Sequence, residues 1–114
     1  MLVLVKATDA SEGAGPSDPA TMEAMGRFNA ELRAAGILRL ADGFKPSSAG
    51  ARVAFDGADR TVTPGPFAPA GERVAGFWIW EVRDLEEAVS WVKRCPNPMP
   101  APSGIEIRPF NVRA

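Results

Sequence analysis

The sequence predicts an α+β fold, in which an antiparallel sheet carries two helices on one of its faces. Two segments with helical periodicity are interleaved with short apolar runs, and the run Val74–Val82 is dense in aromatic and branched residues. Turn residues also separate two alternating runs between positions 51 and 63, which indicates a β-hairpin. The order strand, helix, strand, hairpin, strand, helix, strand is a split βαβ plan. We expect one domain over residues 1–114.

The run Val74–Val82 is apolar on both sides of the expected strand. Phe77 and Ile79 point to one side, and Trp78 and Trp80 point to the other. A small sheet with helices on one face normally has polar residues on its second face. We therefore expect a partner subunit or a ligand to cover that second face. We place the two tryptophans there, as interface anchors rather than as stacking partners of a ligand.

Five further strands are expected. Asp56-Gly57-Ala58-Asp59 forms the hairpin turn between two of them, and the stretch Pro64–Gly71 is a rigid loop that cannot join a ladder. The expected strands cover Met1–Ala7, Ile37–Leu40, Ala51–Phe55, Arg60–Thr63 and Ile105–Arg108.

The first helix begins at one of two capping residues. Either Asp18 caps it with Pro19 at the first helical position, or Thr21 caps it one turn later, and Gly36 ends it. Its apolar stripe contains Met22, Met25, Phe28, Leu32 and Ala35.

The second helix follows Asp84, which forms a capping box with Glu87. We expect Trp91 to lie off its buried stripe, as an exposed or edge contact. The buried stripe contains Leu85, Ala88, Val89, Val92 and Cys95.

Composition excludes several classes of function. The formal net charge of -1 lacks the basic excess of a nucleic-acid or membrane-surface binder. The chain has no histidine, no tyrosine and one cysteine, so we expect neither a metal site nor a cofactor. Proton transfer would depend on Asp, Glu, Lys or Cys95. The run Leu2–Val5 is too short to span a bilayer and has no basic start, so we expect a cytoplasmic protein.

Three stretches of the chain together resemble a known family. They are Thr61-Val62-Thr63-Pro64-Gly65-Pro66-Phe67-Ala68, Ala75-Gly76-Phe77-Trp78-Ile79-Trp80-Glu81-Val82 and Arg94-Cys95-Pro96-Asn97-Pro98-Met99-Pro100. The sequence is similar in these stretches to YCII-related proteins of the DGPF-domain type. The resemblance implies a ferredoxin-like βαββαβ fold with an inserted β-hairpin, which dimerises by packing sheet on sheet as a dimeric α/β barrel. It also implies a bacterial protein, from a family of mostly uncharacterised function, with a cleft for catalysis or ligand binding.

The chain departs from the family pattern where chemistry would occur. Pro64 replaces the usual Asp before Gly-Pro-Phe, Pro69 replaces a common acidic residue, and Gly71 replaces a frequent Lys. Lys45 occupies a position that is often His or Gln in relatives, while Glu72 is retained. Loss of the signature carboxylate favours a binding protein over an enzyme.

Charged residues on the last strand suggest a site. If Ile105 and Ile107 lie under the helices, Glu106 and Arg108 face the other side together with Lys6. They would form either a polar centre in a cleft walled by tryptophan, or a sheet rim that is solvated or paired across a dimer. The ligand-binding candidates are Lys6, Phe67, Trp78, Trp80, Glu106 and Arg108.

Two other features have plainer interpretations. The segment Gly13-Ala14-Gly15 is placed like a phosphate-binding loop, but Asp18 and Glu23 would repel phosphate, so we interpret it as a plain loop. Cys95 lies near the carboxyl end of its helix, where the dipole disfavours a thiolate, so we expect it to pack in the core.

The leading hypothesis is a homodimer, joined through the sheet face, with a small-molecule cleft between the sheet, the hairpin and the loop Pro64–Gly71. One alternative is an enzyme that uses Glu106, Glu81 or Asp9 as the base and Arg108 or Lys6 to stabilise an anion. Another alternative is a regulatory interaction module without catalysis.

Overall fold

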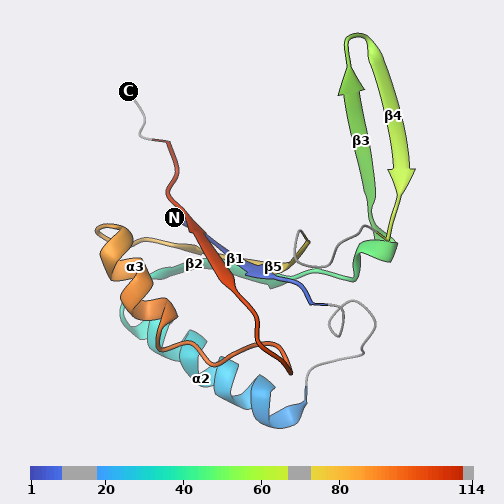
Figure 1. Cartoon of the computed structure of the whole chain (residues 1–114). Coiled ribbons are helices and arrows are strands. Elements are labelled where there is room, and N and C mark those ends of the chain that lie inside the picture. Colours follow the sequence, from blue (N-terminus) through green and yellow to red (C-terminus); the bar gives the residue numbers. More distant parts are fainter. Residues whose placement is uncertain (9–17, 67–72, 112–114) are drawn as a thin grey trace.

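The computed structural model describes residues 1–8, 18–66 and 73–111. It contains a four-stranded sheet, a separate two-stranded hairpin, two α-helices and one 3₁₀ turn (Figure 1). In chain order the elements are β1 (Leu2–Lys6), α2 (Pro19–Ala34), β2 (Leu38–Gly43), η1 (Ser47–Ala49), β3 (Ala51–Asp56), β4 (Asp59–Pro64), β5 (Val74–Trp80), α3 (Leu85–Val92) and β6 (Ile105–Arg108).

The main sheet is antiparallel throughout, with strand order β2-β5-β1-β6. Both helices lie on one of its faces (Figure 1). The predicted α+β class with an antiparallel sheet and two helices is therefore confirmed, and its plan is compatible with a ferredoxin-like fold. Strand β2 extends through Asp42 and Gly43, where the sequence predicted a break. There the backbone N–H of Phe44 donates to the carbonyl oxygen of Ala75 at 2.7 Å and continues the pairing.

The covered face of the sheet contains the tryptophans. Trp78 is 4% exposed and Trp80 is 1% exposed, and the ring of Phe28 on α2 packs edge-on against both, with centroids 6.1 and 6.3 Å apart. The prediction that the indoles lie on the uncovered face is wrong. The physical reason is that the largest side chains are removed most completely from water when they lie between the sheet and the helices.

Neither of the described helices lies over the opposite face of the sheet (Figure 1). Directly opposed residues share a face, and the register places Leu2 beside Ile79 and Leu4 beside Phe77. We call this the open face. Two rows cross it, Leu40–Ile79–Leu2–Arg108 and Asp42–Phe77–Leu4–Glu106. Its centre is therefore apolar, and charges lie at its edges.

Helix α2 begins at the first of the two predicted caps. The Asp18 carboxylate accepts hydrogen bonds from the backbone N–H and the hydroxyl of Thr21, at 3.0 and 2.8 Å. These bonds, that to the backbone first, lower the pKa of Asp18. Gly36 follows the helix with φ of 75°, a left-handed conformation that glycine adopts without strain. Of the predicted stripe, Phe28 and Leu32 are buried, while Met22 is largely exposed.

Helix α3 buries part of the predicted stripe. Ala88 is fully buried and Val92 and Cys95 pack against the core, whereas Leu85 and Val89 are partly exposed. Trp91 turns inward, with its ring centroid 6.4 Å from that of Phe28, so its predicted edge position is wrong. The N-cap Asp84 accepts from the backbone N–H of Glu87 as predicted, at 2.8 Å. In a capping box the Glu87 carboxylate would accept a hydrogen bond from the backbone N–H of Asp84. Here it accepts from the backbone N–H of Arg83, one residue earlier.

Strands β3 and β4 form a hairpin that stands away from the rest of the molecule (Figure 1). We call residues 51–64 the arm. Its existence and its turn were predicted, and both are confirmed. The Cα radius of gyration is 15.8 Å, against about 13 Å for a compact domain of this length. The projecting arm is the reason that the radius exceeds that of a compact domain.

The two buried indoles differ in one respect that predicts a stability difference. The Trp78 Nε1 donates to Asn29 Oδ1 at 2.8 Å, whereas the Trp80 Nε1 has no hydrogen-bond partner among the described residues. We expect Trp78→Phe to lower the free energy of unfolding by about 1–2 kcal/mol more than Trp80→Phe, because only the first breaks a buried hydrogen bond. Urea denaturation of both variants measures this. Equal losses would contradict the assignment.

Candidate functional site

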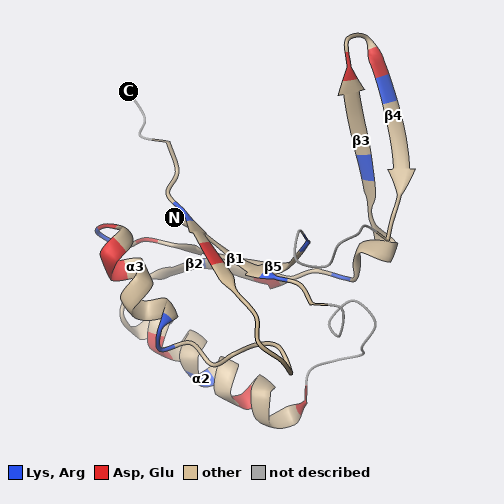
Figure 2. Ribbon diagram, in the orientation of Figure 1, with Lys and Arg blue, Asp and Glu red and all other residues tan. Residues whose placement is uncertain are grey.

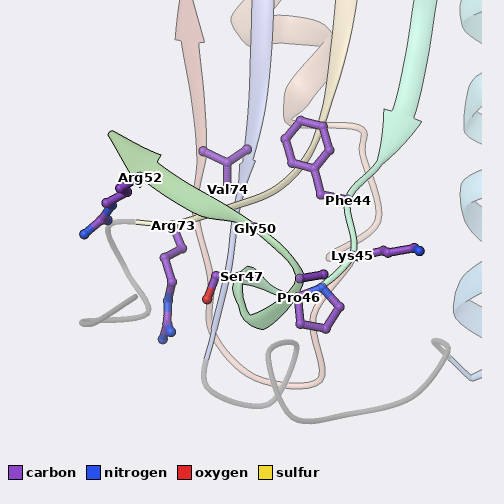
Figure 3. Close-up of a pocket in the computed structure, with 9 residues that line it drawn as sticks. Phe44, Lys45, Pro46, Ser47, Gly50, Arg52, Arg73 and Val74 are labelled. Atoms are coloured by element: carbon purple, nitrogen blue, oxygen red, sulfur yellow. The ribbon is translucent and has the colours of Figure 1, made fainter. Parts of the chain in front are cut away.

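A hollow of ≈ 440 Å³ lies at the foot of the arm. It opens where the end of β2, the turn η1, the start of β3 and the start of β5 meet (Figure 3). Its volume falls within the range of small-molecule sites. The lining residues are Phe44, Lys45, Pro46, Ser47, Ala49, Gly50, Arg52, Arg73 and Val74.

The lining combines apolar walls with positive charge. Phe44 and Val74 extend to one side of the hollow, and Arg52 and Arg73 extend from its other side in similar directions (Figure 3). Lys45 points away from both arginines. No carboxylate or thiol belongs to the described lining. Two arginines and apolar side chains in one lining fit a small organic anion, because guanidinium groups bind carboxylates and phosphates through paired hydrogen bonds.

Close backbone packing shapes one wall of the hollow. Gly65, just after β4, lies so near η1 that a Cβ there would be 1.7 Å from the backbone oxygen of Ser47. Only glycine fits at this approach. The backbone N–H of Gly65 donates to the carbonyl oxygen of Gly50 at 2.9 Å, which joins the two ends of the arm. The following peptide bond, Gly65–Pro66, is cis.

The predicted site residues are not brought together. Glu106 and Arg108 form an exposed ion pair at 3.3 Å along the edge strand β6, and Lys6 ends β1 where the register shifts. Because Trp78 and Trp80 lie on the opposite face, the predicted cleft walled by tryptophan does not form. The charges instead occupy the sheet rim, which was the alternative interpretation. Phe67 lies outside the described residues.

Of the proposed catalytic bases, the two that the structure describes do not line the hollow. Glu81 follows the end of β5 and forms an exposed ion pair with Arg39. Glu106 is paired with Arg108 on β6. Asp9 lies outside the described residues. In the part of the chain that the structure describes, the hollow therefore lacks an acid or base beyond Lys45 and the two arginines.

Sequence reasoning missed Arg52 and Arg73, and noted Lys45 only as a departure from a family pattern. These residues are separated by the hairpin and come from three different segments. Their positions share no periodicity. The available signal was the Pro-Ser-Ser-Ala-Gly stretch before β3, whose turn residues indicate a bend that could bring flanking cations together.

Two kinds of feature are absent from residues 1–8, 18–66 and 73–111. No group of three or more His, Cys, Asp or Glu side chains there could hold a metal ion. No helix in those ranges has the length and apolar character that crossing a membrane requires.

Cys95 packs against the core, as predicted. Burial raises the pKa of its thiol to about 11 from 9.0. A raised acid pKa contributes stability below pH 9.0, and this contribution is lost as pH rises towards 11.

We therefore expect the stability of the wild type relative to Cys95→Ala to fall between pH 9 and pH 11. The expected fall is about 1–2 kcal/mol, less than the full shift because the side chain is partly accessible. Urea denaturation of both proteins across this pH range measures the fall. Taking the difference between them removes the contribution of the lysines, which is the same in both. A constant difference would show that the thiol is not desolvated.

Comparison with known proteins gives a family. The family model described as "YCII-related domain" matches residues 1–111. An uncharacterized protein of Rhizobium meliloti (strain 1021) is 29% identical over 65 residues, which are 57% of this chain. The match spans about half of that relative, 52% of its length. Since the family match covers almost the whole chain and agrees with the resemblance seen in three stretches, the chain belongs to the YCII-related domain family.

Proposed function

We propose that the protein is a homodimer, assembled through the open face of its sheet, that binds a small organic anion in the hollow at the foot of the arm. The observation that carries the binding role is the pairing of Arg52 and Arg73 with the apolar wall of Phe44 and Val74. Cations attract the charged group, and the apolar wall holds the organic part. The absence of a carboxylate or thiol from the described lining favours binding over catalysis.

The dimer is supported by the open face, although by different residues from those expected. Leu2, Leu4, Phe77 and Ile79 form its centre, and each is only partly buried by the chain itself. Phe44 adds to this surface, with its ring 5.7 Å from that of Phe77. An apolar sheet face without cover is the kind of surface that a second sheet packs on. Glu106 and Arg108 on β6 and Asp42 on β2 lie at its two edges, where the rim of an interface carries charge.

We further propose a bacterial, cytoplasmic protein. The relative from Rhizobium meliloti supports the bacterial source. The single cysteine fits a reducing compartment.

Light scattering coupled to gel filtration tests the dimer. We expect twice the 12.1 kDa chain mass at micromolar concentration. Leu4→Glu should give the monomer, because it buries a charge at the centre of the interface. Ala30→Glu, on the exposed side of α2, introduces the same charge and should remain dimeric. A wild type that elutes at the monomer mass would overturn the dimer.

Benzoate and benzamide, which differ in charge but little in shape, test the hollow. We expect benzoate to bind more tightly than benzamide, as measured by ligand-observed NMR. Arg52→Met combined with Arg73→Met should weaken benzoate binding tenfold or more, because charge-assisted hydrogen bonds are lost. Lys93→Met, at the end of α3, removes a cation far from the hollow and should not change it. Equal binding of benzoate and benzamide to the wild type would refute the site. A double variant that binds benzoate as tightly as the wild type would also refute it.

A further inference from the structure

The two faces of the arm differ in chemistry. Cross-strand register places Val53 opposite Val62 and Phe55 opposite Arg60, so these residues share one face. The other face carries Ala54 opposite Thr61. We call Val53, Phe55 and Val62 the apolar face of the arm. Charged residues are confined to the tip and the foot, with uncharged residues between them (Figure 2).

Within residues 1–8, 18–66 and 73–111, this apolar face has little cover. Val53 is 50% exposed, Phe55 is 73% exposed and Val62 is 65% exposed. A two-stranded hairpin alone in water is marginally stable. An extended apolar surface on such a hairpin therefore indicates a contact that the single chain does not supply.

The tip of the arm is held by local contacts. Gly57 occupies the first position of the two-residue turn with φ of 59°, which a type II′ turn assigns to glycine. The Arg60 guanidinium donates to the carbonyl oxygens of Gly57 and Asp59, each at 2.8 Å. The same group lies 4.3 Å from the centre of the Phe55 ring. These contacts within the hairpin define the shape of its tip without a partner.

The arm projects on the side of the sheet where the proposed second copy would lie. It rises from the sheet on the side opposite to the helices, which is the side of the open face (Figure 1). Two sheets packed face to face lie about 10 Å apart, and a strand of six residues is about 20 Å long. A second copy on the open face would therefore stand beside the arm, and the arm would extend past the plane of the partner's sheet.

We propose that each arm packs its apolar face against the second copy, so that two arms related by the two-fold axis clasp the dimer. This rests on the homodimer of the proposed function and adds a second contact to its sheet interface. The chain has other exposed apolar side chains that a partner's arm can contact, among them Leu40 on the sheet and Leu85 and Val89 on α3. A net charge of -1 per copy gives little repulsion between two copies. By symmetry, each residue of the arm contributes twice.

Sedimentation equilibrium of paired variants tests the clasp. We expect Phe55→Ser with Val62→Ser to weaken self-association on the order of a hundredfold, because the dimer contains both substitutions twice. Ala54→Ser with Thr61→Ser changes the opposite face of the same strands and should leave self-association unchanged. Circular dichroism of each monomer should match the wild type, since all four side chains are exposed.

The outcomes separate this inference from the proposed function. If the wild type dimerises and Leu4→Glu abolishes the dimer, but Phe55→Ser with Val62→Ser has no effect, the sheet interface stands and the clasp is refuted. A monomeric wild type overturns both. An equal loss in the two paired variants would show that the arm acts through its own folding and not through its apolar face, and would also refute the clasp.

Photo-cross-linking gives an independent readout. Benzoylphenylalanine at position 55 should yield, on irradiation, a covalent species of twice the chain mass, with the adduct on the partner chain. The same group at position 61 should yield little. Adducts confined to the same chain would overturn the proposal.

Discussion

The structure depends on one-sided cover of a four-stranded sheet. Both helices lie on one face, and the largest side chains, Trp78, Trp80 and Phe28, fill the layer beneath them. An ion pair at 2.5 Å joins Glu31 on α2 to Arg94 in the turn after α3, and Arg94 also lies over the Trp91 ring at 4.4 Å. With both helices used in this way, the described chain has no further element to cover the open face. The apolar centre of the open face is therefore left without cover by the described chain.

The arm follows from the same constraint. Its residues are exposed throughout, so it gains almost nothing from the core and depends on its turn, on Arg60 and on the joint at Gly65 and Gly50. It also supplies Arg52 to the hollow at its foot. Contacts that hold the arm in place therefore also fix one wall of the candidate site. The proposed interface and the proposed ligand site are therefore adjacent in this fold.

Sequence periodicity predicted the elements but could not choose between the two faces of the sheet. Alternation along Val74–Trp80 correctly separates Phe77 and Ile79 from the two tryptophans. Which set lies under the helices depends on the depth of that layer and on partners such as Asn29, which alternation does not encode. The position of Trp91 was misjudged for a similar reason: its ring turns inward, where it meets Phe28 of the other helix. The hollow was missed because its two arginines come to the same lining only through the path of η1 and the hairpin.

The central claim is that one face of the sheet is covered by the chain itself and the other by a second copy. Methyl NMR with a soluble paramagnetic agent tests it directly, by comparing Leu2, Leu4 and Ile79 with Val3 and Val5. The account predicts that all five are protected at high concentration. On dilution into the monomer, Leu2, Leu4 and Ile79 should become strongly attenuated while Val3 and Val5 stay protected. Attenuation of the first three at every concentration, or their protection in the monomer, would contradict it.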